Sequence, residues 1–313
     1  MFAYIVRRIL ATIPVMGVVA IFVFSLLYFS PGDPAAVIAG DLATVDDIEK
    51  IRQQLGLNEP FLVRFSTWLF AILQGDLGTS IFSSLPVSTL IGQRLEATIS
   101  LSITTIVLSV SVAVPLGVLA AARAGGWLDR LVMMFAVLGF SVPVFVLGYV
   151  LIFLFSLELD WLPVQGFVSI REGFWPFLRQ LILPSLALGT IYIALIARMT
   201  RAAMLDVLSQ DYIRTANAKG LGTEKVLLRH ALKNAAVPIV TVVGIGVALL
   251  IGGVVVTESV FAIPGLGRMT VDAILRRDYP IIQGVILMFS FVYVLINLLV
   301  DLSYSLFDPR IRY

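Results

Sequence analysis

Residues 236–257 read AVPIVTVVGIGVALLIGGVVVT and contain no charged side chain. A helix needs about 20 consecutive apolar residues to cross the ~30 Å of hydrocarbon in a bilayer. The stretch therefore predicts a transmembrane helix. Small residues let helices approach closely in lipid, so we interpret its glycines as packing positions in preference to substrate contacts. These glycines are Gly244, Gly246, Gly252 and Gly253.

Five further stretches of this kind predict an all-α polytopic membrane protein with six transmembrane helices. They lie at Ile9–Phe29, Ile99–Ala121, Leu131–Phe155, Leu181–Ala197 and Ile281–Val300. None of the six has an ionisable residue in its interior. Carriers driven by protons or ions usually keep such a residue at membrane depth, so a secondary carrier is disfavoured. The energy for transport is expected to come from outside this chain.

The composition agrees with a membrane protein. Of 313 residues, 59% are apolar and 13% are charged, with a mean hydropathy of +1.00. Soluble domains carry about 25% charged residues. Cysteine is absent and His230 is the only histidine, which excludes disulfides, thiolate metal sites and zinc sites with several imidazoles.

The charged residues in the connections predict the orientation. Arg7 and Arg8 precede a first apolar run that is longer than a signal-peptide core, so we expect an uncleaved anchor. With the N-terminus in the cytoplasm, most of the 22 basic residues lie inside and most of the 20 acids outside. Both termini and residues 198–235 are then cytoplasmic, and residues 31–95 face outward.

We divide the chain into an N-terminal transmembrane helix (1–30), an outer helical segment (31–97) and a five-helix core (98–313). The outer segment is predicted to hold two short helices. Thr44 is placed as the N-cap of the first, with acids following it, and Pro60 starts the second, which stops near Gly75. The apolar face and the end of the first helix come from Ile48, Ile51, Leu55 and Gly56.

The inside connection contains the stretch DYIRTANAKGLGT at residues 211–223. Helix-forming residues continue to Lys219, and Gly220 is placed as the left-handed residue that ends a helix. Thr223 is placed as the cap of the next helix, with Glu224 at its first position. The pattern predicts a short helix between two longer ones, followed by a tight turn.

The surface of this short helix leaves two interpretations open. Small residues would keep its tip slim while apolar and basic residues anchor it in a partner's groove. The other interpretation is a solvated amphipathic loop. The residues concerned are Ala216 and Ala218 for the tip, Tyr212, Ile213 and Leu221 as apolar anchors, and Arg214 and Lys219 as flanking charges.

The loop, continued by His230-Ala231 and Pro238, resembles the cytoplasmic loop of ATP-binding-cassette (ABC) importer permeases of the dipeptide, oligopeptide and nickel group. The resemblance covers nearly the whole chain and is closest to the first of that group's two permease types. Its other pieces are Pro31–Pro34, Leu55–Leu57 with Pro60, Gly75–Gly78, Asp129, Pro143, Leu162-Pro163 with Gly166, Leu183-Pro184, Val260-Phe261, Pro264–Gly267, Arg277–Pro280, Asn297 and Asp308–Arg310.

The resemblance implies a type I importer permease fold and a coupling helix that docks in a groove of a cytoplasmic ATPase. Asn217 departs from the pattern, because the family usually has Arg at that position. The implied partners are a second permease, two ATPase subunits and an extracytoplasmic solute-binding protein. The residues assigned to ATPase coupling are Asp211, Tyr212, Arg214, Thr215, Ala216, Ala218, Lys219, Gly220 and Leu221.

This chain has no phosphate-binding P-loop motif and no catalytic constellation, so we do not expect an enzyme. It is expected to hold no cofactor, with ATP and Mg²⁺ bound by the partner ATPases. Peptides, glutathione, nickel chelates and sugars remain open as solutes. The alternative function is a membrane scaffold or receptor whose inside loop binds a regulatory partner.

Four residues are candidates for the pathway or its outer loop. Pro143 either lines the pathway or forms a fixed kink. The resemblance places Pro264, Gly265 and Gly267 near the entry of solute, although locally they predict only a turn. His230 is interpreted as a histidine that satisfies a local carbonyl, with a pH-sensitive contact to the ATPase as the alternative.

Overall fold

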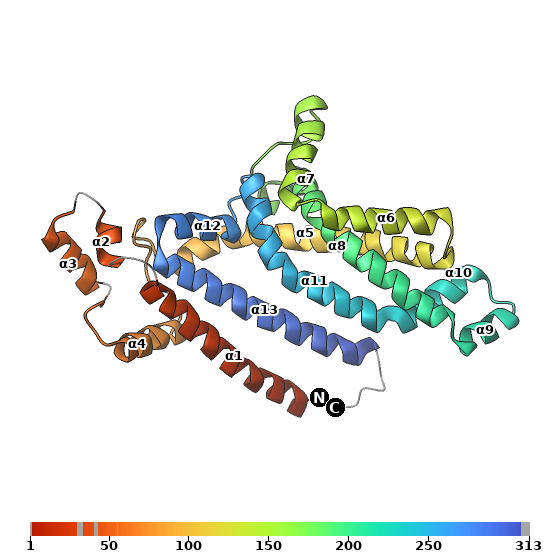
Figure 1. The fold of residues 1–313 in the computed structure, drawn as a ribbon, viewed down its shortest axis with the longest axis horizontal. Coiled ribbons are helices and arrows are strands. Elements are labelled where there is room, and N and C mark those ends of the chain that lie inside the picture. Colours follow the sequence, from red (N-terminus) through yellow and green to blue (C-terminus); the bar gives the residue numbers. More distant parts are fainter. Residues whose placement is uncertain (1, 30–33, 41–42, 55, 308–313) are drawn as a thin grey trace. The chain divides into compact units, whose positions relative to one another are not determined.

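The computed structural model describes residues 2–29, 34–40, 43–54 and 56–307, which are almost entirely helical (Figure 1). The long helices are α1 (Phe2–Phe29), α5 (Val87–Ala122), α8 (Phe174–Leu208), α11 (Leu232–Val260) and α13 (Tyr279–Phe307). The shorter ones are α2 (Pro34–Ala39), α3 (Val45–Gln54), α4 (Phe61–Leu73), α6 (Trp127–Ser141), α7 (Val144–Leu151), α9 (Asp211–Ala218), α10 (Thr223–Lys225) and α12 (Leu266–Arg276). Short segments of other helix types are the π-helices η1 (Ile152–Glu158) and η3 (Val226–Ala231) and the 3₁₀-helix η2 (Ile170–Glu172).

Among the described residues, five helices are long and apolar enough to cross a membrane, and a bent helix pair makes a sixth if it forms one span. The break that Pro143 predicts within the Leu131–Phe155 stretch is observed. The segments Trp127–Ser141 and Val144–Glu158 meet at an angle of 104°. The break has a local cause, because Pro143 has no N–H and forces the preceding residue out of the helical conformation. Val142 is accordingly extended, with φ −93° and ψ 121°.

The chain divides into two compact units, and the division passes through α5, α12 and α13. Residues 96–268 and 295–313 form the second unit, in which α8 lies against α6, α7 and α11. Its larger apolar core cluster contains fully buried leucines at Leu101, Leu181, Leu183 and Leu188.

Close helix approaches in the second unit explain three of the four glycines of residues 236–257. An added Cβ at Gly253 would lie 2.7 Å from Leu188, and one at Gly246 would lie 3.3 Å from Tyr192. An added Cβ at Gly244 would lie even closer to the Val300 side chain. The packing interpretation is confirmed for these three, while a Cβ at Gly252 would meet open space in this chain.

Residues 1–95 and 269–294 form the first unit. Phe24 of α1 packs with three aromatic side chains of α4, at ring-centroid distances of 5.1–5.4 Å. Arg64 lies over the same Phe24 ring, 5.6 Å from its centroid. The two predicted helices of the outer segment are α3 and α4, whereas α2 was not predicted. The division at residues 30 and 97 stays a prediction.

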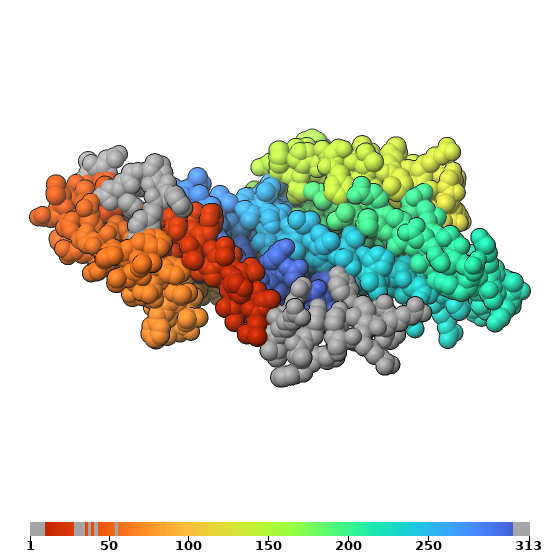
Figure 2. All heavy atoms as spheres, turned by 60° about the horizontal axis from the view of Figure 1, so that its bottom comes forward, coloured from red at the N-terminus to blue at the C-terminus, as the bar shows by residue number. Residues whose placement is uncertain are grey.

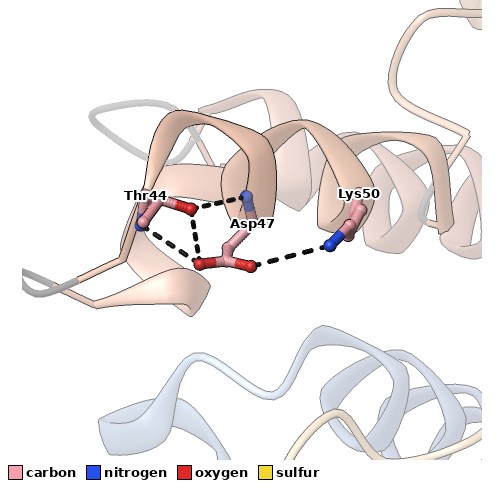
Figure 3. A network of polar contacts seen from close by, with 3 residues as sticks. All are labelled: Thr44, Asp47 and Lys50. Atoms are coloured by element: carbon pink, nitrogen blue, oxygen red, sulfur yellow. Dashed lines mark hydrogen bonds and ion pairs between the residues drawn. The ribbon is translucent and has the colours of Figure 1, made fainter.

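The first turn of α3 is capped as predicted (Figure 3). The Thr44 hydroxyl donates to the Asp47 carboxylate at 2.6 Å and accepts from the Asp47 N–H at 3.3 Å, while the Thr44 N–H donates to the carboxylate at 3.2 Å. These hydrogen bonds lower the pKa of Asp47. Gly56 follows α3 with φ +60°, and Leu55 lies outside the described residues.

Candidate functional site: the helical hairpin of residues 198–235

The hairpin of residues 198–235 consists of the end of α8, then α9, α10 and η3, and the start of α11. Figures 1 and 2 show α9 and α10 at one end of the second unit, where they form an outward tip. The predicted short helix between two longer ones is therefore confirmed. The hairpin projects because α8 and α11 run side by side toward it (Figure 1).

Backbone hydrogen bonds fix the turn after α9. Gly220 has φ +77°, and its N–H donates to the Asn217 carbonyl at 2.9 Å. The Leu221 N–H donates to the Ala216 carbonyl at 3.3 Å. This pair of bonds is a Schellman motif, which satisfies carbonyls that would otherwise be unpaired at a helix end. The left-handed conformation predicted for Gly220 is confirmed.

The predicted cap of the next helix is wrong by one position. Gly222 is the N-cap of α10, and its carbonyl accepts from the Val226 N–H at 3.1 Å. Thr223 is already the first helical residue and makes no capping hydrogen bond. The extended conformation of Gly222, with φ −61° and ψ 147°, lets the helix begin there.

Two residues predicted for the outer surface of α9 face inward instead. Ile213 is 2% exposed and Ala216 is buried, and both belong to a core cluster with Met204 of α8 and Val226 of η3. Leu221 is half-buried against the same cluster. Positions three apart share one face of a helix, so Ile213 and Ala216 turn inward together. They hold α9 in place and are not available as exposed anchors.

The remaining residues assigned to coupling form the exposed surface of the hairpin. Tyr212 is 43% exposed, and Arg214 makes a 3.1 Å ion pair with Asp211 on the solvent side. Asn217, where the family resemblance expects Arg, is also exposed. We call this surface the α9 face. It consists of Asp211, Tyr212, Arg214, Thr215, Asn217, Ala218, Lys219 and Gly220.

A partly buried ion pair fixes the base of the hairpin. Arg201 of α8 donates to both carboxylate oxygens of Asp129, one through Nε and the other through Nη2 at 2.7 Å. Asp129 is 3% exposed and also accepts from the Gly125 N–H at 2.8 Å. The turn between α5 and α6 is thereby tied to α8 shortly before α9 begins. Sequence reasoning missed this pair, although an acid in the first turn of a helix facing a basic loop was a usable signal.

A second buried polar site, which was not predicted, lies where α11 ends and α12 begins. Glu258, near the end of α11, is 0% exposed. Its carboxylate accepts from the Thr98 hydroxyl at 2.6 Å and the Arg268 N–H at 2.9 Å, and Thr98 in turn accepts from the Leu266 N–H at 2.8 Å. Glu258 therefore holds the N-terminus of α12, where a carboxylate complements the helix dipole.

This contact corrects the prediction of a simple turn at residues 264–267, because α12 begins at Leu266. Gly265 and Gly267 are buried, and side chains there would collide with Glu258 and with the α11 backbone. Pro264 is exposed. A role of these residues in the pathway stays a prediction.

Pro143 and His230, the two other residues considered in the sequence, have few specific contacts. Pro143 is exposed and stands at the N-cap of α7. The His230 ring makes no hydrogen bond with any residue that the structure describes, so the local carbonyl partner expected for it is not found. The His230 carbonyl accepts from the Asn234 side chain at 2.7 Å.

Comparisons with known proteins cover the whole chain. Residues 113–313 match the family described as binding-protein-dependent transport system inner membrane component, and residues 1–102 match the N-terminal part of such components. A Sinorhizobium fredii protein named as a peptide ABC transporter permease is 57% identical over 310 residues, covering 99% of both chains. The glutathione transport system permease protein of Escherichia coli is 46% identical over 313 residues, covering 100% of both.

One solved structure shares the fold. An inward-facing methionine ABC transporter contains a chain that aligns with a TM-score of 0.57 and 16% sequence identity. The alignment covers 70% of this chain and 96% of that chain. At this level of identity the likeness concerns the fold alone.

Proposed function

Because the chain belongs to the family of binding-protein-dependent transport system inner membrane components and is an ABC importer permease, we propose that it carries peptides or similar small solutes through the bacterial inner membrane. The predicted all-α permease fold is confirmed. A second permease would complete the path, and a solute-binding protein would deliver the solute. The names of the relatives support peptides and glutathione as the solute class.

We propose that the α9 face docks on a cytoplasmic ATPase. The observation that carries this proposal is the construction of the hairpin. Its inner side is locked by Ile213, Ala216 and the Schellman turn, while none of the residues that the structure describes covers its outer side. A helix that is held rigidly yet exposes an aromatic and basic surface suits insertion into a groove.

The proposed orientation places residues 198–235 and both termini in the cytoplasm, following the distribution of basic residues. ATP and Mg²⁺ would bind to separate ATPase subunits, because this sequence has no P-loop motif. Import should therefore require ATP hydrolysis and no ion gradient. The uncharged interiors of the predicted spans support this expectation.

Proteoliposomes that contain the complete complex and its binding protein test the energy source. ATP supplied on the ATPase side, without any ion gradient, should drive uptake. Uptake driven by a proton or sodium gradient without ATP would contradict the proposal. Failure of any ATPase to copurify with the chain would favour a scaffold or receptor.

Ala218→Trp tests the docking assignment. Ala218 is exposed on the α9 face, so an indole there would prevent close approach of a partner while leaving the packed inner side unchanged. Substrate-stimulated ATPase activity of the reconstituted complex should be lost. Ala11→Trp, at an exposed position of α1, is the matched control and should behave like wild type. Normal stimulation in the Ala218 variant would refute the assignment.

A further inference from the structure

A cavity of about 240 Å³ lies within the first unit. Its walls come from the segment before α5, the first turns of α5 and the part of α12 that belongs to this unit. Arg94, Asp272, Arg276 and Asp278 line it together with apolar side chains such as Leu90 and Met269. A concave apolar wall with a few convergent polar groups is the usual construction of a small-molecule site.

The four charged groups of this cavity are not paired with one another. Asp278 is 2% exposed and is satisfied by the Ser80 hydroxyl, which donates at 2.6 Å, and by the Ile81 N–H at 3.4 Å. The side chains of Arg94, Asp272 and Arg276 make no hydrogen bond or ion pair with any residue that the structure describes; Arg94 is half-buried, whereas Asp272 and Arg276 are exposed at the cavity.

Arg94 is the strongest indication that an anion binds in this cavity. It is half-buried at the start of a helix that is apolar enough to cross a membrane. A guanidinium that is partly removed from water without an anion is costly. Arg276 lines the same cavity, so two guanidinium groups border one small space and favour a carboxylate there. Asp272, also unpaired, offers the opposite charge.

We propose that this cavity binds a small zwitterion of the dipeptide class, with Arg94 and Arg276 holding the carboxylate and Asp272 holding the ammonium group. The volume admits a dipeptide or the end of a longer peptide and is too small for a long chain. In the proposed orientation the cavity opens on the outer side, where the solute arrives. The inference rests on the proposed function and adds a solute site within this chain to it.

The test uses dialanine as the probe, with dialanine amide and N-acetyl-dialanine as its charge variants. Binding to the complex in lipid nanodiscs is measured by saturation-transfer NMR in the absence of the binding protein, so that only membrane-embedded sites contribute. Wild type should bind dialanine roughly tenfold or more tightly than its amide, because charged hydrogen bonds are lost.

Two variants test recognition of the carboxylate and of the ammonium group separately. In the double variant Arg94→Gln, Arg276→Gln, dialanine should bind no better than its amide. Wild type should bind N-acetyl-dialanine more weakly than dialanine, because the acetylated probe has no ammonium group. In Asp272→Asn, this difference should disappear, whereas the preference for the free carboxylate should persist. Arg171→Gln, at an exposed arginine in η2, is the matched control and should retain both preferences. If the double variant is unstable, Arg276→Gln alone should reduce the preference and Arg276→Lys should restore part of it.

Two results would overturn the proposal. One is a wild-type complex that imports dialanine with ATP but shows no charge preference in binding, which leaves the proposed function intact. The other is an unchanged preference in the double variant combined with weaker docking of the binding protein, which would assign the arginines to that protein. Absence of ATP-driven peptide uptake in wild type would instead indicate failure of the proposed function.

Discussion

Gly220 and Gly222 offer a matched test of the hairpin. An alanine Cβ at either position would meet no heavy atom of the described residues within 4 Å other than those of its chain neighbours, so steric contact cannot distinguish the two substitutions. Their backbones differ, with φ +77° at Gly220 and φ −61° at Gly222. Gly220→Ala therefore perturbs only the left-handed turn, whereas Gly222→Ala leaves an allowed conformation unchanged.

The expected magnitude follows from this difference. Holding alanine in the left-handed region costs about 1–2 kcal/mol. The equilibrium between the closed and open turn should then shift by roughly 5- to 30-fold, since 1.4 kcal/mol corresponds to a factor of ten. Gly222→Ala should leave the turn at residues 220 and 221 closed, although alanine is a poorer N-cap than glycine and the first turn of α10 should loosen. Gly220→Pro should be more severe, because proline also lacks the N–H that donates to the Asn217 carbonyl.

Hydrogen exchange of the assembled complex, followed by mass spectrometry, is the direct assay. The amides of residues 220 and 221 close the turn, and in Gly220→Ala they should exchange about 5- to 30-fold faster. Gly220→Asn should recover most of the protection, because asparagine tolerates this conformation. Stimulated ATPase activity should fall in the order Asn, Ala, Pro. Equal protection in Gly220→Ala and Gly222→Ala would refute the assignment.

Three further predictions concern residues outside the hairpin. Asp47→Cys, in a chain without cysteine, should react with a membrane-impermeant maleimide added outside, and labelling only from inside would reverse the topology. Glu258→Ala should lower the free energy of unfolding by about 2–3 kcal/mol, because buried donors lose their acceptor, and Glu258→Gln should cost less; equal thermal stability of the two would contradict this. The lowered pKa of Asp47 means that its stabilisation of α3 is present above the ordinary pKa of aspartate and is lost as the pH falls through the folded value. Amide exchange in α3 should accelerate over that range in wild type, and Thr44→Val should remove this dependence.

Local physical rules account for the features that could be predicted from the sequence. The spans follow from the hydrocarbon thickness, and the α9 turn follows from a glycine placed after helix-forming residues. The capping of α3 by Thr44 depends on residues three apart, so it was also accessible.

The features that were missed depend on distant parts of the chain. Asp129 and Arg201 are 72 residues apart in sequence, and Glu258 and Thr98 are 160 apart. The acid in the first turn of α6 was a local signal for an interaction of Asp129, but no local pattern identified Arg201 or Thr98 as the partner in either pair. The inward orientation of Ile213 likewise depends on where η3 packs, which a helical period alone does not determine. The bend angle at Pro143 could not be predicted from the sequence, because a proline indicates that a helix breaks but not in which direction. The angle depends on the helices that pack around the break.

The length of α8 has a mechanical consequence. Its 35 residues form a rod of about 50 Å, compared with the ~30 Å of hydrocarbon in a bilayer. A tilt of about 5° would displace the far end of such a rod by about 4 Å. The Asp129–Arg201 pair clamps a second helical corner to this rod close to its end. The helix therefore has the form of a lever arm. A small tilt within the membrane would displace the hairpin by a distance comparable to the width of a side chain.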